Sequence, residues 1–195
     1  MTYFTNFNAP QLTKITTSLR TQFTAKMLFH AKLSPSDEKT SRLFMMFLLI
    51  VDKAAREYIA GHDSLTAYIN STNKTDFLID GLGRYETCVV TLKRAYKLLD
   101  RLKNQQDSPV FNRQLRKLIE TWEKPVTDVR NAIEHMDEKI LKNELANGEA
   151  HLLSVDVTGN FLELTKYKIS FTTVYNAVKN LHLAGIDMIE KLPVS

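Results

Sequence analysis

Seven apolar residues between positions 78 and 99 recur at alternating spacings of four and three residues. This rhythm keeps side chains on one stripe of an α-helix, and such a stripe has to be buried against a neighbouring helix. The pattern therefore predicts a long helix that packs in a bundle or in a dimer. Its members are Leu78, Leu82, Tyr85, Val89, Leu92, Tyr96 and Leu99.

Two helices are predicted before this stripe. Apolar residues from Leu12 to Met27 recur every three or four positions and predict a helix from Gln11 to about Lys32. A second helix is expected from about Asp37, with Ser34 or Ser36 as its cap. We expect it to end near Gly61, followed by one or two further helical turns over 64–70.

A fourth helix is predicted from Pro109, capped by Ser108, to about Leu141. Pro125 lies inside it, lacks a backbone N–H, and should kink or split it. After Gly148 the apolar period changes from helical to alternating, which predicts a β-hairpin over about 149–169. Its turn would lie at 158–160, and a last helix would follow at 170–191.

The chain thus predicts a single domain over residues 1–195, an all-α, up-and-down helical bundle with a β-hairpin insertion before the last helix. Only six Gly and five Pro in 195 residues agree with long helices. The single Cys88 cannot form an intrachain disulfide. The longest apolar run, residues 43–51, is nine residues long, whereas a membrane span needs about 20. With no signal-peptide pattern at the N-terminus, we expect a cytoplasmic protein without membrane association.

The segment 125–141 divides into two faces when it is projected as a helix. One face is apolar and should be buried: Val129, Ala132, Ile133, Met136 and Ile140. The other face is polar: Thr127, Arg130, Asn131, Glu134, His135 and Glu138. It combines a guanidinium that can bind phosphate with an imidazole that can transfer protons near neutral pH.

The segment Arg130-Asn131-Ala132-Ile133-Glu134-His135 resembles the motif of the HEPN superfamily, in which Arg is followed after four to six residues by His. The residue directly after the Arg is often polar, as Asn131 is here. The family is an all-helical bundle that dimerises so that two motifs face each other across a cleft. The resemblance implies metal-independent RNA cleavage without a cofactor. It also implies RNA as substrate, a homodimer through the motif helix, and a bacterial toxin–antitoxin or phage-defence setting with an antitoxin or defence-complex protein as a further partner.

The resemblance implies a role for each motif residue. His135 would be general base on the ribose 2′-hydroxyl or general acid on the leaving 5′-oxygen. Arg130 would bind the scissile phosphate, and Asn131 would orient His135 or contact the phosphate. Glu134 is a further candidate, since it could hold Arg130 in place. Some subfamilies carry a Tyr two residues after the His that an antitoxin modifies; this chain has Asp137 there, so the resemblance does not extend to that mode of control.

Two alternatives stay open for the same residues. The polar face can be a solvated surface with an Arg130–Glu134 ion pair worth a few tenths of a kcal/mol. It can also belong to a catalytically inactive HEPN-like module that binds nucleic acid or a protein partner. Arg56 and His62 fit the loose motif too, but Arg56 is followed by Glu57 and His62 lies beyond Gly61.

The net charge of +4 is concentrated in one part of the chain. Residues 84–130 contain 11 basic and six acidic residues. Such a run is often a solvated face, but it also offers the charge that an RNA backbone attracts. The candidate RNA-binding residues are Lys93, Arg94, Lys97, Arg101, Arg113, Arg116 and Lys117.

No other pattern points to chemistry. The remaining histidines have no second His or Cys at metal-ligand spacing, so we expect no metal site. Gly81-Leu82-Gly83 lacks the third glycine and the strand of a dinucleotide fingerprint. Cys88 adjoins the apolar stripe and is expected to be a buried thiol without a catalytic role.

Overall fold

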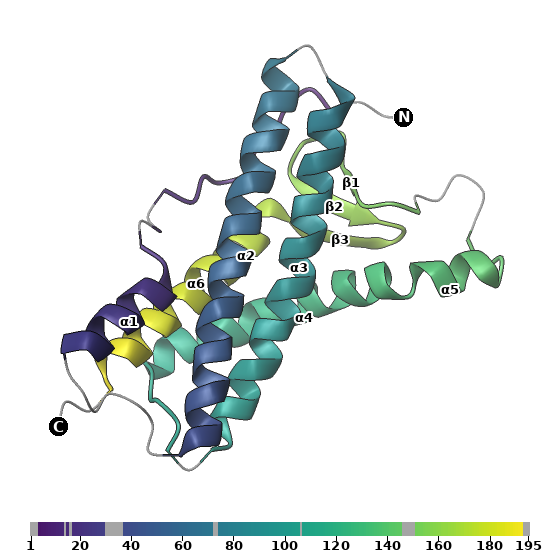
Figure 1. Cartoon of the computed structure of the whole chain (residues 1–195). Helices are drawn as coiled ribbons and strands as arrows, with labels where there is room; N and C mark the ends of the chain where they lie inside the picture. Colours follow the sequence, from purple (N-terminus) through teal and green to yellow (C-terminus); the bar gives the residue numbers. More distant parts are fainter. Residues whose placement is uncertain are drawn as a thin grey trace.

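The computed structural model describes residues 4–13, 15, 17–29, 37–71, 74–105, 107–145 and 151–192. Six helices and three short strands follow one another along these residues (Figure 1). The helices are α1 (Leu19–Phe29), α2 (Glu38–Asn70), α3 (Thr75–Lys103), α4 (Arg113–Glu134), α5 (Met136–Leu141) and α6 (Phe171–Glu190); the strands are β1 (Ser154–Val155), β2 (Phe161–Leu164) and β3 (Tyr167–Ser170). The prediction of a mostly helical chain is confirmed.

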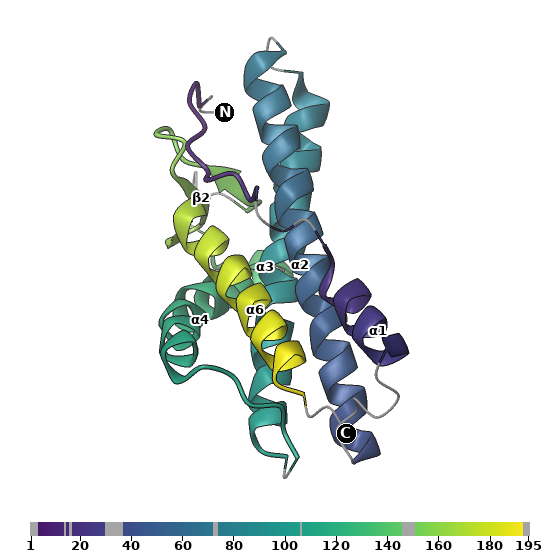
Figure 2. The same cartoon turned by 90° about the vertical axis from the view of Figure 1, so that its left-hand side faces the viewer.

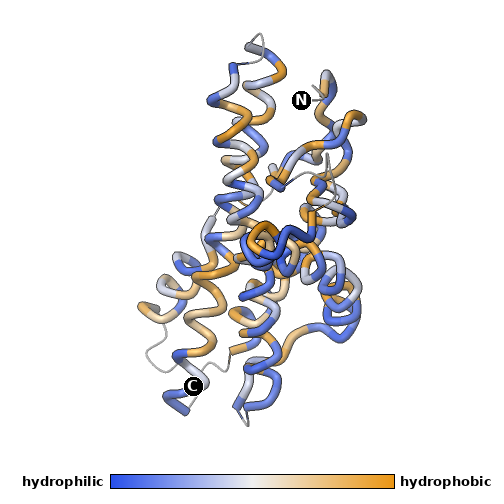
Figure 3. Tube along the Cα trace, turned by 90° about the vertical axis from the view of Figure 1, so that its right-hand side faces the viewer, coloured by the Kyte–Doolittle hydropathy of each residue, from blue (hydrophilic) through white to orange (hydrophobic). Residues whose placement is uncertain are grey.

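Four helices form a closed ring around the core. The two longest, α2 and α3, pack against each other as an antiparallel pair, and α4 packs against α3. Figure 2 shows α6 between α4 and α2, where it contacts both and closes the ring. In Figure 3 hydrophobic and hydrophilic residues alternate along the long helices, as helices with one buried face require. The short α5 projects from the body at the end of α4 (Figure 1).

The apolar stripe of α3 is buried from Tyr85 onward, while Leu78 and Leu82 near its start are only partly buried. Tyr85, Val89, Leu92, Tyr96 and Leu99 are almost fully excluded from solvent. All five belong to the same buried cluster as residues of α2, α4 and α6, so this part of the stripe lies in the core. The last helix is also confirmed: Ser170 caps α6 by accepting a hydrogen bond from the backbone N–H of Thr173 at 3.0 Å.

The prediction that α2 ends at Gly61 is wrong, because the helix continues to Asn70. A Cβ atom at Gly61 would lie 3.0 Å from the ring of Tyr85 on α3. The glycine therefore allows the two helices to approach closely and does not stop the helix. At the start, Asp37 caps α2 through the backbone N–H of Thr40 at 2.8 Å, while the predicted caps Ser34 and Ser36 lie outside the described residues.

The first helix is shorter than predicted and begins at Leu19, not at Gln11. The buried carboxylate of Asp52 on α2 accepts hydrogen bonds from the backbone N–H groups of Leu19 and Arg20, at 2.8 and 3.0 Å. These bonds satisfy the first turn and fix where the helix starts. None of the described residues before it is helical, and the carbonyl of Pro10 accepts a hydrogen bond from the hydroxyl of Tyr58. The predicted residues 30–32 lie outside the described part.

The fourth helix also differs at both ends. It begins at Arg113 with Asn112 as its cap, not at Pro109 with Ser108, because the side chain of Asn112 accepts the N–H of Gln114 at 2.7 Å. Pro125 does not split it. Val126 and Val129 are buried in the core and hold the following turns in place. The interruption falls at His135, between α4 and α5.

The predicted hairpin is a three-stranded antiparallel sheet in the order β1-β2-β3. Its first turn lies at 158–160 as predicted. A second turn at Thr165, where the backbone φ is 53°, separates β2 from β3 where a continuous extended arm was expected. The second turn brings Leu164 opposite Tyr167 and lets Leu162 and Ile169 share the buried face.

Candidate active site and basic groove

The predicted motif lies on the last turns of α4 and on the junction with α5. Val129, Ala132 and Met136 are buried as expected, so the opposite side of the helix faces outward. Ile133 is partly buried against the core. Ile140 was expected on the same buried face but is 50% exposed, because α5 projects beyond the bundle.

Arg130 is held by its two motif neighbours. One guanidinium nitrogen, Nη1, donates to the side-chain oxygen of Asn131 at 3.1 Å and forms an ion pair with Glu134 one turn later. Asn131 therefore contacts the guanidinium, and no contact between its side chain and His135 is seen among the described residues. Glu134 holds Arg130 in place, as one of the sequence-based interpretations suggested.

His135 lies where α4 ends. Its backbone φ and ψ are −100° and 12°, and its N–H donates to the carbonyl of Asn131 at 3.1 Å. The side chain is 57% exposed, and Nδ1 lies 3.5 Å from a carboxylate oxygen of Glu138. A proton on Nδ1 would face this carboxylate and leave Nε2 as the acceptor nitrogen. Glu138 was predicted on the polar face without a role, and its spacing of three residues from His135 is the sequence signal for this contact.

The side chains of Arg130 and His135 diverge within one chain. Five residues at 100° each place them about 140° apart around the helix. Arg130 and Glu134 line a groove between α2, α3 and α4 that His135 does not line. Within one copy of the chain, the guanidinium of Arg130 and the imidazole of His135 thus point in different directions.

The groove has a volume of about 630 Å³ and is rich in cations. Four of its lining residues, on α3, were predicted to bind RNA: Lys93, Arg94, Lys97 and Arg101. Arg130 and Glu134 line it from α4, and Lys53 from α2. Lys53 could not be recognised from the sequence, because it lies on a different helix, some 40 residues before the basic run.

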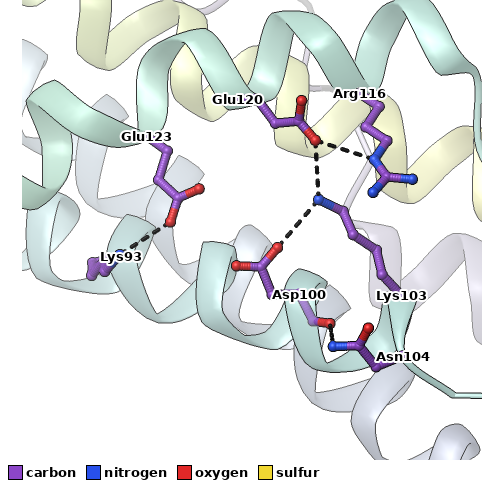
Figure 4. A network of polar contacts seen from close by, with 7 residues as sticks. All are labelled: Lys93, Asp100, Lys103, Asn104, Arg116, Glu120 and Glu123. Atoms are coloured by element: carbon purple, nitrogen blue, oxygen red, sulfur yellow. Dashed lines mark hydrogen bonds and ion pairs between the residues drawn. The ribbon is translucent and has the colours of Figure 1, made fainter.

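The other three predicted cations, Arg113, Arg116 and Lys117, are not among the residues that line this groove. Figure 4 shows what holds one of them. Arg116 donates to Glu120 at 3.1 Å, and Lys103 lies between Glu120 and Asp100 at 3.4 and 3.2 Å. The hydrogen bond from Arg116 lowers the pKa of Glu120, so the network stays ionised and ties α4 to α3. Lys93 is likewise paired, with Glu123 at 3.1 Å.

Other reactive side chains are placed in structural positions. Burial raises the pKa of the Cys88 thiol far above its usual value, and its sulfur contacts the carbonyl of Ala54 at 3.4 Å. A thiol held neutral in this way is not a nucleophile. Within the described ranges, no three His, Cys, Asp or Glu side chains gather where they could hold a metal ion. None of the described helices is long and apolar enough to cross a bilayer.

Comparison of the chain with protein-family models, with curated proteins and with solved structures finds no match.

Proposed function

We propose that this protein is a metal-independent endoribonuclease of the HEPN type. The observation that carries the proposal is the position of Arg130, which belongs to the Arg-to-His motif and lines a groove rich in cations. Phosphate binding along the groove would bring an RNA backbone to the guanidinium. The same motif offers, at His135, an exposed imidazole whose Nδ1 faces Glu138.

The proposed reaction needs two proton transfers, one from the attacking 2′-hydroxyl and one to the leaving 5′-oxygen. Nε2 of a neutral His135 removes the proton of a ribose 2′-hydroxyl, and the oxygen attacks the adjacent phosphorus. The bond to the 5′-oxygen breaks, and the imidazole of His135, protonated by the first transfer, gives that proton to the leaving 5′-oxygen. The products are a 2′,3′-cyclic phosphate and a free 5′-hydroxyl. Arg130 offsets the charge that develops on the phosphate oxygens.

Two copies of the chain complete the site in this proposal. Because Arg130 and His135 diverge by about 140° on one helix, one protomer cannot readily direct both at the same phosphate. A symmetric dimer through the motif helix brings Arg130 of one protomer toward His135 of its partner. The exposed side of α4 and the projecting α5 carry the side chains that such a contact would use.

Cleavage in the presence of a chelator tests the proposal. Purified protein should cut a single-stranded RNA in excess EDTA and leave a 2′,3′-cyclic phosphate end. Arg130→Ala and His135→Ala should each reduce the rate by at least about 100-fold, as the loss of a catalytic proton donor or charge usually does. Arg42→Ala and His151→Ala are matched controls, since Arg42 lies at the start of α2 and His151 is an exposed residue before β1.

A catalytically inactive module that binds nucleic acid is the second candidate. The ion pair between Glu134 and Arg130 favours it, because it occupies the guanidinium that should meet the phosphate. Salt-dependent RNA binding that His135→Ala leaves unchanged, without cleavage by the native protein, would support this candidate. Cleavage that survives both motif substitutions would instead refute the assigned site.

A further inference from the structure

The groove between α2, α3 and α4 contains more positive charge than its own acidic residues can offset. Lys53, Arg94, Lys97 and Arg101 line it and are exposed, and within the described part of the chain none of them forms an ion pair. Lys93 is paired with Glu123 and Arg130 with Glu134, which is the only acidic side chain among the described lining residues. Four like charges in one recess repel one another, and an anionic ligand would remove that repulsion.

The unpaired cations of the groove are arranged in a row along α3 and are not clustered at one position. Arg94, Lys97 and Arg101 are spaced by three and four residues, so they lie on one side of α3. At 1.5 Å per residue the row extends over about 10 Å. Lys53 faces the same groove from α2. A row of this length suits a chain of several phosphates, whereas a single phosphate could meet only one or two of these cations.

The uncharged lining residues cannot read bases or sugars. Met46, Ile50, Val90 and Leu98 are aliphatic, so the described lining offers no aromatic ring on which a base could stack. The remaining polar residue, Thr91, is only 5% exposed. Contacts in the groove would therefore be limited to the charged backbone, which carries no sequence information.

We propose that the groove binds the backbone of a single-stranded nucleic acid and accepts DNA as well as RNA. The groove has a volume of about 630 Å³ and lies between three helices, which leaves room for part of one strand but not for a duplex. That the bound strand continues to a cleavage site rests on the proposed function. DNA lacks the 2′-hydroxyl that would attack the phosphorus, so it would occupy the groove uncleaved and inhibit RNA cleavage competitively.

Fluorescence anisotropy with a labelled 12-nucleotide strand tests the proposal. The His135→Ala protein keeps RNA intact, and RNA and DNA of the same sequence should bind it with dissociation constants within about twofold. Four phosphate contacts predict a slope of about −3 for log affinity against log salt. Arg94→Ala/Lys97→Ala should weaken binding and reduce the magnitude of the slope by about 1.4, because two contacts are lost.

Arg20→Ala/Lys39→Ala is the matched control, with one Arg and one Lys removed from exposed positions outside the groove. Its affinity and slope should equal those of the His135→Ala parent. An equal loss in the control, a preference for RNA above tenfold, or tighter binding of a duplex would overturn the proposal. If the native protein binds strands with these properties but cuts no RNA, the proposed ribonuclease activity is refuted and the nucleic-acid groove is not. If the protein cuts RNA and DNA does not inhibit the cleavage, the proposed binding of DNA in the groove is refuted and the ribonuclease activity is not.

Discussion

Glu134 has opposite effects on the two proposed roles of the motif, catalysis and phosphate binding. It holds Arg130 in one position, which favours catalysis, but it also brings a negative charge into a groove for phosphates. Glu134→Gln should therefore bind RNA about two- to fivefold more tightly in the His135→Ala background, since removal of one close unfavourable charge is worth about 0.5–1 kcal/mol. Anisotropy at low salt measures this, with Asp137→Asn as the control, because Asp137 is exposed on α5 and does not line the groove. An unchanged affinity would mean that the phosphates do not approach Glu134.

His182 makes stability depend on pH at a position far from the motif in the sequence. It is buried on α6, and burial lowers the pKa of its imidazole, an effect that the nearby carboxylate of Asp52 only partly opposes. A histidine with a lowered folded-state pKa is protonated first in the unfolded chain. The stability is thus complete above the unfolded pKa of about 6.5 and is lost as the pH falls toward the folded pKa.

Urea unfolding at about pH 8 and about pH 5.5 measures this effect. The native protein should lose more free energy of unfolding between the two values than His182→Gln, which cannot take up the proton. Equal losses in the two proteins would show that His182 is not the group responsible.

At the scale of elements, sequence periodicity predicted the features that residues of one helix determine. It missed the helix ends that depend on contacts with neighbouring helices. The stripe of α3 and the cap of α6 are determined by residues that lie three or four positions apart in the same segment. The start of α1 depends on Asp52, which lies more than 30 residues away. In the same way, Gly61 looked like a helix stop because the ring of Tyr85 that packs on it cannot be seen from the sequence around it.

The candidate site was predictable to a similar degree. The projection of 125–141 correctly separated buried Val129 from outward-facing Arg130 and His135. It could not show that Lys53 joins the basic residues of α3, because that depends on how α2 packs against α3. Nor could it show that Glu123 and Glu120 neutralise part of the basic run, since those contacts cross from α4 to α3.

The turn between β1 and β2 anchors the N-terminal segment, and this gives a stability prediction. Gly159 has a φ of 71°, and a Cβ atom there would lie 1.8 Å from the carbonyl oxygen of Asn6. Its own carbonyl accepts the N–H of Asn8 at 3.0 Å. Gly159→Ala should therefore destabilise the protein by about 1–3 kcal/mol, which thermal unfolding would detect as a lower midpoint.

Gly83→Ala is the control with the opposite sign. Gly83 lies within α3 and has open space around the position of a Cβ atom. An alanine there should stabilise the helix by about 0.5–1 kcal/mol. If both variants shifted the midpoint in the same direction, the contact between the turn and Asn6 would not account for the effect.

At the scale of the whole molecule, the proposed function requires more than one chain. The core of one protomer is formed by α1, α2, α3, α4, α6 and the sheet, and of α5 only Met136 belongs to it, while the rest of α5 projects from the bundle. Leu141 on α5 is 85% exposed and Ile140 is half exposed, next to His135. An apolar end beside an exposed motif is where a symmetric partner would bind, because such a contact repeats the same surface on both copies.

Mixing two inactive variants tests whether the site is shared. An Arg130→Ala protomer keeps His135, and a His135→Ala protomer keeps Arg130, so a mixed dimer has one complete pair across its interface. After full exchange half of the dimers are mixed, and each has one of two sites, so about a quarter of native activity should return. The control replaces the His135→Ala partner with an Arg130→Ala/His135→Ala double variant, which supplies no guanidinium and should restore nothing. If differently tagged copies exchange and no activity returns, Arg130 and His135 act within one chain; a protein that is active and strictly monomeric would lead to the same conclusion.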